Sequence, residues 1–131
     1  MNFEPAITVL RSALPDLAVV YLFGSAASGE MHPESDVDLA FLATAKLDPV
    51  ARFELQERLA ALLHRSVDLV DLRIATTVLR VQVIGGGRVL YERSAGERAR
   101  FEAAALGAYA RLNEERRGIL EDVRSRGRIH G

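Results

Sequence analysis

Two carboxylates stand one residue apart at the start of the apolar run DVDLAFL, which begins at Asp36. Side chains two apart on a strand project from the same face, about 6.6 Å apart along the chain, so Asp36 and Asp38 should point together. Like charges this close repel and raise each other's pKa unless a cation neutralises them. Mg²⁺ suits this role, because it takes oxygen ligands from one or two carboxylates and from substrate phosphates. The pair therefore indicates a magnesium site that binds the phosphates of a substrate.

A third carboxylate is expected from a neighbouring strand. The stretch SVDLVDL offers Asp68 and Asp71, which lie on opposite faces of a strand because they are three residues apart. Asp68 is favoured on the metal face, since Val67 and Leu69 then point into the core. Asp71 stays open as the alternative.

A glycine and a serine, Gly24 and Ser25, follow the buried apolar run LAVVYLF. Glycine permits a positive φ and a close backbone approach, and exposed amides with a hydroxyl in such a turn can hold phosphate oxygens. A Gly-Ser pair alone is weak evidence, because by itself it favours an ordinary turn. Its separation from Asp36 by a spacer of ten residues, with Asp68 on a later strand, favours phosphate binding.

Helical spacing and capping residues predict four helices that position these strands. Asp48 and Pro49 suit the N-cap and first position of the second helix, with a buried stripe at Val50, Phe53, Leu59, Leu62 and Leu63. Ser94 and Glu97 form a capping box that opens the last helix. The predicted helices are 4–14, 49–63, 76–84 and about 95–128.

The sequence predicts an α/β (α+β) fold, a small mixed sheet backed by helices in one domain over residues 1–131. Strands are expected at 17–23, 36–42, 66–72 and 88–92, with a loop at 24–35. The first two strands should pair antiparallel because only that loop joins them, and helix 49–63 can serve as a crossover. The catalytic core should span about 17–92, followed by the helical segment.

Bulk composition narrows the function. The chain has 131 residues, no cysteine, 49% hydrophobic residues and a net charge of −1. We therefore expect a cytoplasmic protein with no disulfide, no membrane segment and no general affinity for nucleic acid. The one local basic excess is residues 111–131, with six arginines against four acidic residues, and it predicts either an exposed helix or a docking surface.

Gly24-Ser25, a ten-residue spacer, Asp36-x-Asp38 and a later strand carboxylate together resemble the DNA polymerase β-like nucleotidyltransferase superfamily. The run GSAASGEMHPESDVDL is most similar to its minimal nucleotidyltransferase (MNT) group. The resemblance implies that Asp36, Asp38 and Asp68 are catalytic and bind two Mg²⁺ ions. It also implies that Gly24, Ser25 and Ser35 bind the nucleotide, with ATP as substrate.

The segment RARFEAAALGAYARLNEERRGILEDVRSR is similar to the C-terminal helix of MNT antitoxins paired with HEPN ribonuclease toxins. This implies a HEPN toxin as partner, a hetero-oligomer, and transfer of AMP from ATP to a tyrosine hydroxyl that silences the toxin. The alternatives are an antitoxin that only masks the toxin, and a free-standing nucleotidyltransferase with another acceptor. Ala26 and Ser28 depart from the pattern, since Arg is common in this loop.

Overall fold

The computed structural model describes residues 1–29 and 35–130, with side chains as far as residue 125. The order of helices and strands is the predicted one, with one addition, the short helix α2 inside the expected loop 24–35. Part of that loop, 30–34, lies outside the described residues. The elements are α1 (Glu4–Ala13), β1 (Leu17–Phe23), α2 (Ser25–Ser28), β2 (Val37–Ala43), α3 (Pro49–Leu63), β3 (Val67–Asp71), α4 (Thr77–Gly86), β4 (Arg88–Glu92) and α5 (Ala95–His130).

The four strands form one mixed sheet in the order β3-β2-β1-β4. β1 pairs antiparallel with both β2 and β4, while β2 and β3 are parallel and joined through α3. These pairings confirm the predicted antiparallel pair and the crossover role of α3. The C-terminal end of β1 therefore lies at the same end of the sheet as the N-terminal ends of β2 and β3.

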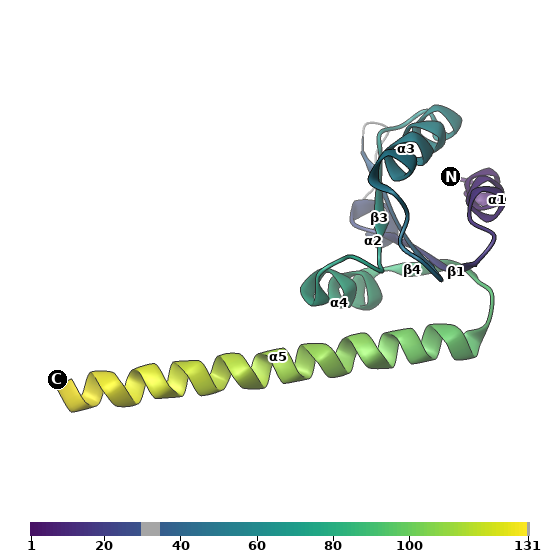
Figure 1. Ribbon diagram of the computed structural model, residues 1–131. Coiled ribbons are helices and arrows are strands. Elements are labelled where there is room, and N and C mark those ends of the chain that lie inside the picture. The colour runs from purple at the N-terminus through teal and green to yellow at the C-terminus, as the bar shows by residue number, and fades with distance from the viewer. Residues whose placement is uncertain (30–34, 131) are drawn as a thin grey trace.

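Helices cover both faces of the sheet. α1 and α3 lie over one face and α4 and α5 over the other, and α5 continues well past the rest of the molecule (Figure 1). Burying one large apolar side chain stabilises the fold by about 1.5–3 kcal/mol. The core under α1 and α3 includes Leu10, Leu22, Phe41, Leu59 and Leu69, and the core under α4 and α5 includes Val19, Tyr21, Ala40, Leu72 and Val83.

The buried stripe predicted for α3 is partly wrong. Val50 and Phe53 are 64% and 54% exposed, and Leu62 is also exposed, whereas Leu55 and Leu59 are buried. The helix therefore turns a different face to the sheet from the one that its large apolar residues indicate. The N-cap of α3 is as predicted, since the carboxylate of Asp48 accepts hydrogen bonds from the two amides that follow Pro49.

Two polar residues explain the orientation of α3. Gln56 Oε1 accepts a 2.9 Å hydrogen bond from the Leu69 amide, and Arg52 Nη1 donates a 3.0 Å bond to the Leu69 carbonyl. β3 is an edge strand, and unpaired backbone groups on such a strand need partners. The face of α3 that meets the sheet thus combines Leu55 and Leu59 with the polar side chains that satisfy this edge.

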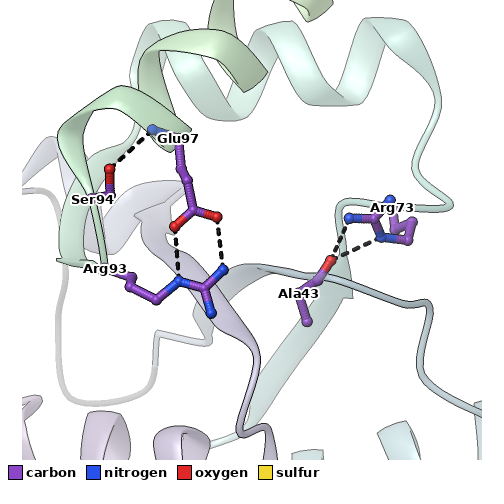
Figure 2. Close-up of polar contacts among 5 residues, drawn as sticks. All are labelled: Ala43, Arg73, Arg93, Ser94 and Glu97. Carbon is purple, nitrogen blue, oxygen red and sulfur yellow. Dashed lines mark hydrogen bonds and ion pairs between the residues drawn. The ribbon is translucent and has the colours of Figure 1, made fainter.

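The start of α5 contains half of the predicted capping box. The Glu97 amide donates to Ser94 Oγ at 3.3 Å, but the Glu97 carboxylate is taken by Arg93, with N–O distances of 2.7 and 2.8 Å (Figure 2). The carboxylate therefore pairs with a guanidinium instead of returning to the Ser94 amide.

Within the described residues, no helix is both long and apolar enough to cross a membrane.

Candidate active site

Asp38 and Asp68 are direct neighbours across the parallel pair of strands. Asp38 pairs with Asp68 in the register of β2 and β3, and neighbouring strands lie about 4.8 Å apart. Val37 and Leu39, on either side of Asp38, are both fully buried. As predicted, the strand therefore packs one face in the core and presents its carboxylate on the other.

The three carboxylates interact electrostatically, with Asp36 and Asp68 acting on Asp38. Burial raises the pKa of Asp38 above the ordinary value for an aspartate, and the charges of Asp68 and Asp36 raise that pKa further. Asp36 and Asp68 are themselves exposed. Three neighbouring carboxylates that raise the pKa of one of their number are suited chemically to a hard divalent cation.

The carboxylates do not form a complete metal cage by themselves. Among the described residues, no three acidic or histidine side chains converge closely enough to hold a metal ion unaided. Mg²⁺ commonly keeps several waters and binds one or two carboxylates together with substrate phosphates. Asp36, Asp38 and Asp68 fit that incomplete kind of site, which the phosphates of a bound nucleotide would complete.

Gly24 lies against the Asp38 carboxylate. Its backbone has φ 69° and ψ −153°, a conformation nearly restricted to glycine. A Cβ at this position would come 2.2 Å from Asp38 Oδ2, which is far inside van der Waals contact. The sequence indicated a close approach at Gly24 but not that Asp38 was what approached. The shared register of Phe23 with Asp38 is what brings the turn and the carboxylate together.

Ser25 and Ser35 flank the same end of the sheet. Ser25 is half-buried and is the first residue of α2, directly after Gly24. Ser35 is half-buried and immediately precedes Asp36. The two predicted nucleotide-binding segments thus lie at the end of the sheet where the carboxylates lie, because β1 ends where β2 begins.

Asp71 lies apart from this site. It is the last residue of β3 and is only 2% exposed. Its Oδ2 accepts from the Leu47 amide at 2.9 Å, and its Oδ1 accepts from the Arg73 amide at 3.0 Å. Asp71 therefore has a structural role, which its sequence neighbours did not indicate. Of the two candidates for the third carboxylate, Asp68 is the one that lies beside Asp38.

A cavity of about 240 Å³ lies at the opposite end of the sheet, and none of the predicted site residues lines it. Arg73 and Arg93 stand at this cavity, and both are already engaged (Figure 2). Arg73 donates two hydrogen bonds to the Ala43 carbonyl, and Arg93 is paired with Glu97. The acidic end, rather than this cavity, carries the chemistry indicated by the sequence.

Comparison with known proteins bears on this site. Residues 6–96 match the family model described as polymerase beta, nucleotidyltransferase. The chain is 42% identical over 123 residues to the protein adenylyltransferase MntA of Shewanella oneidensis, which covers 94% of this chain and 88% of that relative. The matched family region contains all of the predicted catalytic and nucleotide-binding residues.

Two solved structures extend the likeness to more than nine-tenths of the chain. A crystal structure of a toxin-antitoxin with AMP-PNP matches with a TM-score of 0.86 and 41% identity, over 94% of this chain and 98% of that one. A structure of a tri-AMPylated Shewanella oneidensis HEPN toxin in complex with an MNT antitoxin matches with a TM-score of 0.78 and 39% identity, over 92% and 93% of the two chains. With residues 6–96 matched by the family model and a 42% identical relative covering 94% of its length, this chain belongs to the polymerase β nucleotidyltransferase family.

Proposed function

We propose that this chain is the antitoxin of a HEPN/MNT pair and transfers AMP from ATP to a tyrosine hydroxyl of its HEPN toxin, which is thereby neutralised. The carrying observation is the cluster of Asp36, Asp38 and Asp68 beside Gly24, in a chain that resembles a protein adenylyltransferase over nearly its full length. Likeness to a toxin-antitoxin solved with AMP-PNP and to an MNT antitoxin in complex with a HEPN toxin supports this function.

The carboxylates would each have a distinct role. Asp36 and Asp38 would hold two Mg²⁺ ions between them, while Asp68 would contact the catalytic ion alone and accept or position the proton of the acceptor hydroxyl. When bound there, Mg²⁺ would neutralise the triphosphate and lower the pKa of the attacking hydroxyl. The raised pKa of Asp38 fits a carboxylate group whose repulsion a cation relieves.

The nucleotide would be held at the turn after β1. The amides at Gly24 and Ser25, the Ser25 hydroxyl and Ser35 would hold the β and γ phosphates, which places the α phosphorus before the carboxylates. The acceptor oxygen forms a bond to the α phosphorus, and the bond from that phosphorus to the bridging oxygen of pyrophosphate breaks. The acceptor proton is lost toward Asp68, and pyrophosphate leaves.

Labelled ATP tests this chemistry directly. The cognate HEPN protein is incubated with this chain, Mg²⁺ and ATP labelled in either the α or the γ phosphate. Transfer of AMP labels the HEPN protein from α-labelled ATP only, and Asp38→Asn abolishes the label while its circular dichroism spectrum stays that of the parent. Label from the γ position would indicate a kinase reaction, and label retained in Asp38→Asn would contradict the role of Asp38.

The expected cytoplasmic location stays a prediction.

A further inference from the structure

The second half of α5 extends beyond the sheet and the other helices (Figure 1). Residues 114–125, here termed the arm, have exposed side chains throughout. In Figure 1, α5 passes α4 and continues beyond the rest of the molecule. The first half is different, because Phe101 packs against the core and Ala105 is 4% exposed.

The direction of the arm follows from the contacts of the first half. Directly before α5, the Arg93 amide donates to the Ala18 carbonyl, near the start of β1. Further along, Glu102 accepts a 2.9 Å hydrogen bond from the hydroxyl of Tyr21, three residues farther along β1. α5 therefore runs in the same direction as β1, toward the end of the sheet where β1 meets Gly24.

The arm extends past that end. Phe23, the last residue of β1, is two residues beyond Tyr21, a distance of about 7 Å along a strand. A helix covers that distance in about five residues, so the end of β1 is level with roughly residue 107. From there to residue 125 the helix rises by about 27 Å, which carries the arm beyond the candidate active site.

The arm also lies on the matching side of the sheet. Asp38 shares its strand face with Ala40, and Ala40 packs in the core that α4 and α5 cover. The carboxylates therefore open toward the side along which α5 runs. A molecule bound to the arm would therefore lie on the side of the sheet toward which the carboxylates open.

The surface of the arm has a specific chemistry. Ile119, Leu120 and Val123 are 64%, 59% and 58% exposed and lie on one side of the helix. A lone helix is marginally stable in water, and Gly118 within the arm weakens it further. Clustered exposed apolar side chains of this kind mark protein interaction surfaces.

We propose that the arm is the docking surface for the HEPN toxin, and that it holds the toxin with its acceptor hydroxyl toward Asp36, Asp38 and Asp68. This inference rests on the proposed function. A match that covers 94% of this chain includes most of α5, so the helix is retained in a relative whose structure is a toxin-antitoxin. The arm carries three arginines against four acidic residues, which disfavours RNA as its occupant.

A pair of matched variants tests the docking role. Ile119→Gln/Val123→Gln removes two of the three apolar side chains, while Arg117→Gln/Glu121→Gln changes charged side chains that point away from Ile119 and Val123 on the same helix and leaves the net charge unchanged. Glutamine is a good helix former, so both variants should keep the helical circular dichroism of the parent. Affinity for the purified cognate HEPN protein and for ATP with Mg²⁺ is measured by calorimetry for the full chain and each variant.

The apolar variant should bind the HEPN protein at least about tenfold more weakly, as expected when two central anchors are lost. Its KM for the HEPN protein in AMP transfer should rise similarly, while its affinity for ATP and that of the Arg117→Gln/Glu121→Gln control stay at the parental values. Unchanged HEPN affinity in the apolar variant would overturn the inference, as would self-association of the parent through this surface. Failure of the parent to transfer AMP while the apolar variant loses binding would refute the proposed activity and leave the docking role standing.

Discussion

Gly24 and Asp38 lie so close that a Cβ on Gly24 would reach 2.2 Å from Asp38 Oδ2. We therefore predict that Gly24→Ala displaces the carboxylate and lowers AMP transfer by at least about 100-fold, the cost of a misplacement of about 1 Å. The positive φ of 69° adds strain of about 1–3 kcal/mol, seen as a lower melting temperature. Transfer rates and thermal unfolding measure both effects.

Gly29 supplies the matched control. It also has a positive φ, 81°, but nothing lies within 4 Å of where its Cβ would be. Gly29→Ala should therefore lower the free energy of unfolding by about 1 kcal/mol and retain transfer. Equal losses of transfer in Gly24→Ala and Gly29→Ala would show that backbone strain, not the contact with Asp38, is responsible.

Asp68 and Asp71 should respond in opposite ways to the same change. Asp68 is exposed and faces Asp38, so Asp68→Ala should reduce transfer by at least about 100-fold and change stability by less than about 0.5 kcal/mol. Asp71→Ala removes the buried carboxylate that accepts from the Leu47 and Arg73 amides and should cost about 1–3 kcal/mol, with transfer retained below its melting temperature. A severe transfer defect confined to Asp71→Ala would reverse the assignment.

Removal of the Asp38 charge should increase stability when Mg²⁺ is absent. The folded chain binds the Asp38 proton more tightly than the unfolded chain, because the pKa of Asp38 is raised. Its contribution is therefore favourable below the unfolded pKa and is lost as pH rises through the folded pKa. Asp38→Asn should unfold at a higher urea concentration than the parent at pH 7 and at the same urea concentration as the parent near pH 3. A variant less stable at pH 7 would contradict this.

Tyr21 should anchor α5 through Glu102. Its side chain is 1% exposed, and burial together with the Glu102 carboxylate raises the pKa of its hydroxyl, which keeps it a donor. Tyr21→Phe should lower the free energy of unfolding by about 1–2 kcal/mol, because a buried bond to a charged group is lost. Tyr109→Phe, at a half-buried position on α5, should change it by less than about 0.5 kcal/mol. Chemical unfolding of both variants gives the comparison, and equal losses would refute the anchor.

Short-range patterns made much of the fold predictable. Val37 and Leu39 alternate with Asp38, so one strand shows both its buried face and its acidic one. The loop-only connection of β1 and β2 required the antiparallel pair that brings Gly24 to Asp38. The candidate site was foreseeable because each of its parts is at the end of a strand with a recognisable pattern.

Long-range pairings were not predictable in this way. Tyr21 and Glu102 are 81 residues apart, and nothing near either residue indicates the other. The face that α3 turns to the sheet depends on the needs of an edge strand, which Gln56 satisfies, rather than on the apolar residues of the helix. The buried role of Asp71 likewise depends on the Leu47 amide, which only the folded chain places beside it.

The most direct test of the central claim is the intact mass of the cognate HEPN protein after incubation with this chain, ATP and Mg²⁺. Asp36→Ala/Asp38→Ala serves as the control, since it removes two of the three clustered carboxylates. We predict a gain of one AMP or a small multiple of it, absent in the control and located on a tyrosine. A HEPN protein that binds this chain and is neutralised with no gain in mass would contradict the account and leave an antitoxin that acts by masking.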